Sequence, residues 1–114
     1  MHREKSATRT DLLPGTLNLL ILQTLRHGPM HGYAIAKHIQ EHSKNTLQVL
    51  EGSLYPALQR LLRNGWVTDE WVPAEPKRRA RVYRLTTAGR KQVEEQAPEL
   101  ARVMEAVLRL IQPA

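Results

Sequence analysis

Cysteine and phenylalanine are both absent from this chain of 114 residues, and only two tryptophans and three tyrosines are present. The lack of cysteine excludes disulfides, thiolate zinc sites and a cysteine nucleophile. It also fits a reducing cytoplasm, where we expect the protein to be located. Because aromatic side chains are so few, we expect a core built from aliphatic side chains.

Long apolar runs are missing as well. No stretch approaches the roughly 18 apolar residues that a membrane-spanning helix requires, and the first residues mix charged and polar side chains. The length of 114 residues leaves room for one compact domain and not for a second of ordinary size. We therefore expect one soluble domain without a membrane partner.

Catalytic and metal-binding patterns are also weak. Of the five histidines, His38 and His42 are four residues apart and could share one face of a helix. No carboxylate is spaced with them into a recognisable metal site, and solvated histidines are far more common than ligands. Ser53 has no base near it in the sequence. We therefore expect no enzyme activity, no metal and no cofactor.

Acidic residues are outnumbered, since Lys and Arg total 17 and Asp and Glu total 11, for a formal net charge of +6. Most of the excess lies in one short segment without any acid. Its basic residues are Lys77, Arg78, Arg79, Arg81 and Arg84. The segment before it, 66–76, has acids and no base. Such local concentration is better suited to contacting phosphates than to general solubility.

The apolar pattern predicts three short helices. The first is opened by Pro14 and ended by 27–29 (His-Gly-Pro). Its apolar side chains point in nearly every direction, so it must be buried on several sides, and a partner chain is implied. A second helix follows Gly32, and a third covers 51–65. Three short helices with tight turns are typical of a helix-turn-helix.

A hairpin is expected directly after the third helix. Segments 66–72 and 81–85 favour strands, and the residues between them, 73–80, favour a loop with two prolines and three bases. A hairpin in this position is the wing of a winged helix-turn-helix. The predicted fold is therefore α+β and mostly helical.

A final helix is capped by Thr86 or Thr87. Its apolar residues alternate at spacings of four and three, which is the a/d pattern of a helix seam. The seam either packs on the core of the same chain or pairs with a second chain. Pro98 lies inside it and predicts a kink or break near Ala97. The dimerisation residues that we expect on the first and last helices are Leu17, Ile21, Val93, Leu100, Met104, Val107 and Ile111.

Several strings in order resemble the PadR family of transcriptional regulators. They are 12–17 (LLPGTL), 31–35 (HGYAI), 51–58 (EGSLYPAL), 65–67 (GWV), 83–86 (YRLT) and 89–90 (GR). Together they span roughly residues 12–92, and the single short C-terminal helix looks like the smaller PadR subfamily. The resemblance implies a homodimer that represses transcription from a pseudo-palindromic operator. It also implies that the last helix mediates dimerisation.

This resemblance divides the chain into three expected parts. Residues 1–12 form a flexible tail, 13–86 form the winged helix-turn-helix domain, and 87–112 form the dimerisation helix. The segment 51–65 then becomes the recognition helix, and double-stranded DNA becomes the partner.

The recognition helix begins with residues suited to close approach. Gly52 and Ser53 can bring backbone N–H groups to a phosphate, although Ser53 could instead be an N-cap. Tyr55 can reach a phosphate or a thymine methyl group, or pack under the wing. Pro56 falls in the first turn and offers shape without a hydrogen bond.

Base reading and phosphate contact are assigned to longer side chains. Gln59 is suited to adenine and Arg60 to guanine in the major groove. The family resemblance implies that Tyr33 contacts the DNA backbone, with core packing as its alternative. In the wing, phosphates are neutralised by Lys77, Arg78, Arg79 and Arg81.

Two questions stay open at this point. A non-specific nucleic-acid-binding protein is the alternative function, and single-strand binding would require aromatic stacking on a basic face. A small-molecule effector is possible but unidentified. No aromatic residue follows Tyr83, so a planar drug has no stacking partner on the last helix, and Trp66 and Trp71 are assigned to the core or the wing.

Overall fold

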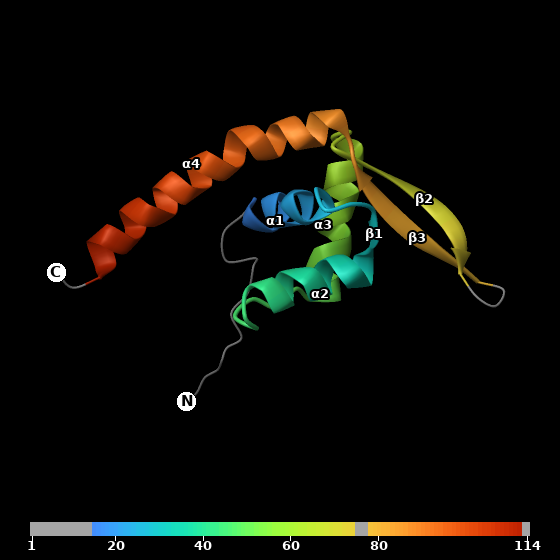
Figure 1. Ribbon diagram of the computed structural model, residues 1–114, viewed down its shortest axis with the longest axis horizontal. Coiled ribbons are helices and arrows are strands. Elements are labelled where there is room, and N and C mark those ends of the chain that lie inside the picture. The colour runs from blue at the N-terminus through green and yellow to red at the C-terminus, as the bar shows by residue number, and fades with distance from the viewer. Residues whose placement is uncertain (1–14, 75–77, 113–114) are drawn as a thin grey trace.

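The computed structural model describes residues 15–74 and 78–112, which form a mostly helical fold with one small sheet (Figure 1). The predicted α+β class is confirmed. The expected tail 1–12 and the helix-opening Pro14 lie outside the described residues. The elements are α1 (Thr16–Leu25), β1 (Met30–His31), α2 (Gly32–His42), α3 (Glu51–Arg63), β2 (Val67–Ala74), β3 (Arg78–Leu85) and α4 (Thr87–Ile111).

The boundaries of α3 follow from local chemistry. Leu50 is the N-cap residue, without a side-chain cap, so Pro56 lies in the second turn and not in the first as expected. Proline has no N–H, and the carbonyl of Gly52 therefore lacks its usual helical partner. At the other end Gly65 adopts a φ of 75°, where glycine is favoured. The Trp66 N–H then donates to the Leu61 carbonyl at 3.0 Å and closes the helix.

The sheet is antiparallel with the strand order β1-β3-β2. The hairpin is longer than predicted, because Val67 pairs with Leu85 at one end and Ala74 with Arg78 at the other. Arg78 and Arg79 therefore lie in a strand and not in the loop expected over 73–80. Pro73 is tolerated because β2 is an edge strand. The short strand β1 was not expected from the sequence, and its two residues pair with Val82 and Tyr83.

The core is centred on α1, which contacts α2, α3 and α4 of its own chain (Figure 1). Ile21 is fully buried, Leu17 is 5% exposed, and Val93 of α4 is fully buried as well. No partner chain is therefore required to cover α1, contrary to the expectation. These three residues belong to the core of one chain and not to a surface between two chains, because a buried side chain cannot contact a partner.

The last helix, α4, is capped by Thr86, one of the two predicted caps, since the Gly89 N–H donates to the Thr86 hydroxyl at 3.0 Å. It continues through Pro98 without interruption, so of the two predicted alternatives, a kink or a break, the break is wrong. Figure 1 shows that its axis bends near the middle and that its second half extends away from the body. A proline inside a helix is a usual cause of such a bend. Within the described ranges, no helix has the length and apolar character needed to cross a membrane.

Candidate nucleic-acid interface

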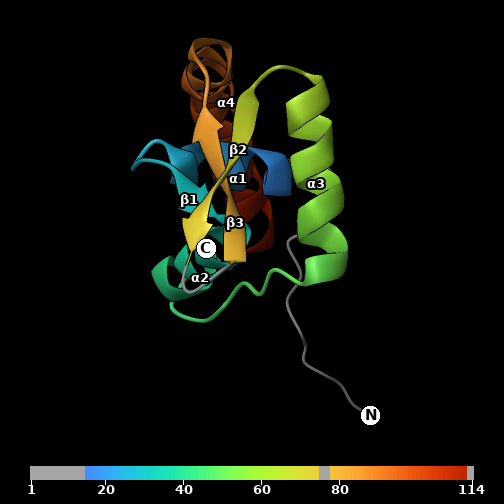
Figure 2. The same cartoon turned by 90° about the vertical axis from the view of Figure 1, so that its right-hand side faces the viewer.

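The hairpin of β2 and β3, which we call the wing, runs beside α3 (Figure 2). The start of α2 lies next to both, because β1 immediately precedes it and pairs with β3. One side of the molecule therefore presents the wing, α3 and the first turn of α2 together. Most of the predicted DNA-binding residues belong to these three elements.

The two faces of α3 differ in burial. Leu54, Leu58 and Leu61 are buried against the core. On the opposite face, Gly52 and Gln59 are exposed, and apart from the adjacent residues and backbone of the helix itself, no atom lies within 4 Å of the position of a Cβ at Gly52. The helix therefore presents an open backbone and one amide side chain to solvent, as a recognition helix requires.

Two predicted residues of α3 are placed differently from the expectation. The Arg60 guanidinium donates to the Asn18 amide oxygen of α1 at 3.3 Å, so its side chain reaches toward α1. Gln59 is then the better placed of the two predicted base readers. The N-cap alternative for Ser53 is wrong, because the N-cap position belongs to Leu50.

Two tyrosines line the junction of α2 and α3. Tyr33 is 74% exposed, so core packing is wrong for it. The Tyr55 ring lies against the start of α2, where a Cβ at Gly32 would be 2.9 Å from the Tyr55 hydroxyl. Because Gly32 has no side chain, the hydroxyl-bearing rings of α2 and α3 can lie at one edge of the interface.

The wing arginines are not equivalent. The Arg81 Nε donates to the Asp69 carboxylate at 2.5 Å, and a second contact forms an ion pair. Arg84 pairs with Glu70 at 3.5 Å. The acidic strand of the hairpin therefore faces its basic strand. The sequence indicates such a pairing, because an acidic segment is followed directly by a basic one. The positive charge of Arg81 is compensated within the chain, which lowers its value as a phosphate contact.

The cations near the wing tip have a different environment. Arg79 is exposed, and its guanidinium lies 5.8 Å from the centre of the Trp71 ring, within the range of a cation–π contact. Lys77 lies outside the described residues, and Arg78 is placed by its backbone in β3. Tyr83 lies on the same strand, and its burial raises the pKa of its hydroxyl.

The histidine candidates also come together. The His38 and His42 rings are stacked with centroids 3.9 Å apart, and His27 lies 5.1 Å from His38. Burial lowers the pKa of His38, and the neighbouring His42 and His27 lower it further. Stacked rings face one another, whereas metal ligation needs converging ring nitrogens. The described residues hold no group of three or more side chains arranged for a metal ion.

Comparisons with known proteins agree with this architecture. The model of the Transcriptional regulator PadR-like family matches residues 21–95. The Transcriptional regulator Rv3488 of Mycobacterium tuberculosis is 34% identical over 92 residues, which cover 81% of this chain and 82% of that protein. An uncharacterized protein X of Lysinibacillus sphaericus is 27% identical over 99 residues, or 87% of this chain and 91% of that protein.

Solved structures resemble the fold as well. A transcriptional regulator from Clostridium thermocellum has a TM-score of 0.80 and 25% identity, covering 90% of this chain and 99% of that one. Bacillus subtilis PadR in complex with operator DNA has a TM-score of 0.66 and 26% identity, covering 71% of this chain and 46% of that one. The chain therefore belongs to the PadR-like family, and it is a transcriptional regulator and not an enzyme.

Proposed function

We propose that this regulator is a repressor that binds a pseudo-palindromic operator in double-stranded DNA as a homodimer. The observation that carries the proposal is the surface formed by the exposed face of α3, the first turn of α2 and the basic wing. This surface combines an open helix backbone at Gly52, the amide of Gln59 and the exposed cation of Arg79. The similarity to Bacillus subtilis PadR, solved with operator DNA, supports the same partner.

The test begins with a duplex selected from a random pool by the purified protein. We expect this duplex to bind much more tightly than a scrambled duplex of equal length at physiological salt, since specific binders typically show a preference of 10³-fold or more. Reporter transcription should fall when the selected site overlaps a promoter. Equal affinity for the selected and scrambled duplexes would favour the non-specific alternative.

The first residue-level prediction concerns Gln59. Replacing it with alanine should relax sequence choice, because one bidentate contact to a base contributes about 1–3 kcal/mol of discrimination. We expect the preference for the selected duplex to fall about tenfold or more, while the affinity for scrambled DNA changes little. Competition binding with both duplexes measures this ratio.

The matched control for this experiment is Gln23→Ala, an exposed glutamine on α1. It removes the same amide from another surface and should leave the ratio of affinities unchanged. If Gln59→Ala weakened binding to both duplexes equally, Gln59 would be a backbone contact and not a base reader.

The proposed dimer is supported by the second half of α4. Its exposed apolar side chains include Val107 at 45%, Leu110 at 85% and Ile111 at 70% exposure. An exposed row of apolar side chains on a helix that extends from the body is typical of an interaction surface. A second copy related by two-fold symmetry would match the symmetry of a pseudo-palindromic operator.

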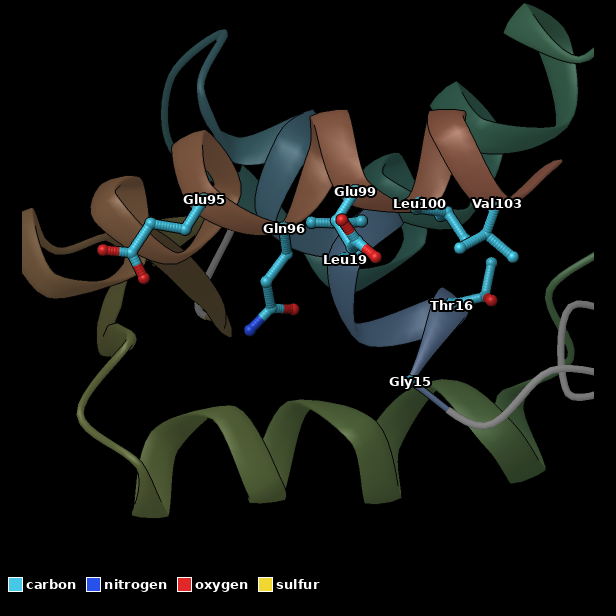
Figure 3. A pocket seen from close by; sticks show the side chains of 8 residues that line it. All are labelled: Gly15, Thr16, Leu19, Glu95, Gln96, Glu99, Leu100 and Val103. Carbon is cyan, nitrogen blue, oxygen red and sulfur yellow. The ribbon is translucent and has the colours of Figure 1, made fainter. Parts of the chain in front are cut away.

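A groove between α1 and α4 offers this second copy a place to dock. It has a volume of about 370 Å³. Figure 3 shows Leu19 of α1 on one side and four residues of α4 on the other, namely Glu95, Glu99, Leu100 and Val103. The far end of α4 carries Arg109 in its last turn. In an antiparallel pair of α4 helices the Arg109 end of one copy would lie near Glu95 in the groove of the other, whereas Glu99 is already paired with Arg102 of its own chain.

The second prediction tests this interface with the double change Val107→Asp and Ile111→Asp. Both side chains are exposed in one chain, so the fold should survive, whereas two carboxylates buried between copies would be strongly unfavourable. Light scattering coupled to size-exclusion chromatography should show a monomer in place of a dimer. Glu105→Gln, an exposed change on the same helix, should leave the dimer intact. A variant that remained dimeric with two aspartates would contradict the proposed interface.

A further inference from the structure

All three tyrosines and one of the two tryptophans line a single cleft between the wing and the starts of α2 and α3. We call this the wing–helix cleft; its volume is about 420 Å³. Tyr83 forms a buried floor at 1% exposure, whereas Tyr33 and Trp71 are 74% and 56% exposed. In a chain without phenylalanine, this concentration of aromatic side chains around a single cleft points to an interaction site.

The wing side of the cleft is held by a network on one face of the sheet. Trp71 pairs with Arg81 across the two strands. The Arg81 guanidinium lies 5.8 Å from the Trp71 ring centre and 5.7 Å from that of Tyr83, and it pairs with Asp69. Because Arg81 is paired with Asp69, its guanidinium lies within cation–π distance of both the exposed Trp71 and the buried Tyr83.

The chemistry of the cleft mouth suits one sugar–phosphate strand. The exposed Tyr33 and Tyr55 hydroxyls and the indole N–H are neutral hydrogen-bond donors for phosphate oxygens, and the flat ring faces can pack against deoxyribose. Arg79 adds an exposed cation beside Trp71. Half or more of the hydrogen bonds in protein–DNA complexes go to phosphate and sugar. The cleft also lies between α3 and the wing, which are the two elements proposed to contact the duplex.

We propose that Trp71 is a further DNA-contacting residue, which packs against one backbone strand of the duplex in the wing–helix cleft. Arg81 and Asp69 act as positioning residues, which hold the Trp71 ring in place and do not themselves bind a phosphate. This inference rests on the proposed function, since it assigns a contact within the proposed DNA interface.

The experiment compares the full chain with Trp71→Leu and with Arg79→Ala on the selected duplex and on its scrambled form. We expect Trp71→Leu to weaken both complexes about tenfold, the effect of losing one aromatic contact. Because indole is neutral, the slope of log affinity against log salt should stay that of the unchanged chain. Arg79→Ala should instead reduce this slope by about 0.9.

Intrinsic fluorescence provides a second, direct readout. The duplex should change the emission of the unchanged chain, and this change should disappear in Trp71→Leu, where only the half-buried Trp66 remains. Trp66→Phe serves as the matched control and should keep both the signal and the affinity. Thermal unfolding should be nearly the same for Trp71→Leu, because its side chain is mostly exposed.

Three results would overturn the inference while leaving DNA binding established. Trp71→Leu could bind both duplexes like the unchanged chain. It could lose as much salt slope as Arg79→Ala, which would mean that Trp71 acts only by holding Arg79. Emission could respond to a small aromatic anion such as 2-naphthoate but not to the duplex, which would assign the cleft to a small ligand. Failure of the unchanged chain to prefer its selected duplex would instead overturn the proposed function.

Discussion

Replacing Arg78 and Arg79 together with alanine should weaken binding to every DNA sequence and flatten its dependence on salt. Each phosphate contact contributes about 0.9 to the slope of log affinity against log salt, so the pair should remove about 1.8. At 0.1 M salt this corresponds to an affinity loss of about 60-fold, relative to a 1 M reference where the electrostatic term vanishes. Binding isotherms on selected and scrambled duplexes at several salt concentrations measure both quantities.

The reason for choosing these two arginines is the pairing of the others. Arg81 and Arg84 are each matched by a carboxylate from β2, so a phosphate would have to compete with that carboxylate. Arg79 is exposed near the wing tip, and Arg78 is its neighbour in β3. The part of the DNA affinity that does not depend on base sequence should therefore come chiefly from the arginines near the wing tip.

The matched control removes the same two charges from α4, by the double change Arg90→Ala and Lys91→Ala. Both side chains are exposed, and the net charge falls by the same amount as in the wing variant. We expect its salt slope to remain close to that of the unchanged chain. If the two double variants lost affinity equally, then overall charge would attract DNA and the wing would have no special part.

Gly89→Ala should destabilise the fold more than any of the surface substitutions. A Cβ at this position would lie 2.1 Å from the Trp66 carbonyl oxygen and 2.8 Å from a Leu85 methyl carbon. The clash with Trp66 is with backbone, so α4 itself would have to move away from the base of the wing. We expect a loss of about 3 kcal/mol in the free energy of unfolding. In thermal unfolding this should appear as a decrease in Tm of roughly 10–20 °C.

A matched control is available at another helical glycine. Gly52→Ala adds its methyl group to open space, and alanine favours a helix over glycine by up to about 1 kcal/mol. This variant should be as stable as the unchanged chain or slightly more stable. All the proteins should be compared at one concentration, because the proposed dimer would contribute to measured stability. Equal stability of the two alanine variants would contradict the close packing of α4 at Gly89.

Local signals in the sequence were sufficient for much of the fold. The apolar spacing of α3 and the glycine at position 65 predicted where that helix lies and ends, because periodicity and caps act within a few residues. The threonines at 86 and 87 predicted the start of α4 to within one residue for the same reason. The basic run after the third helix indicated the wing, although the ladder from Val67–Leu85 to Ala74–Arg78 made its strands longer than propensity indicated.

The sequence predicted which residues belong to the candidate site. It did not predict which of their side chains contact one another. Gln59 and Tyr33 are exposed as their predicted roles require, because helical periodicity separates buried from exposed faces. The contact of Arg60 with Asn18 joins residues 42 positions apart, and no local pattern indicates it. The pairing of Asp69 with Arg81 likewise depends on the register of two strands.

The sequence by itself determined the type and order of the helices, the presence of a basic hairpin and the family, because these depend on short-range patterns and ordered strings. Only the tertiary structure decided that α1 is buried within its own chain, that Met30 and His31 form a third strand, and that Trp71 meets Tyr33 and Tyr55 in one cleft. Each of these depends on how distant segments pack together. Packing is a property of the whole chain, and the periodicity of one segment does not contain it.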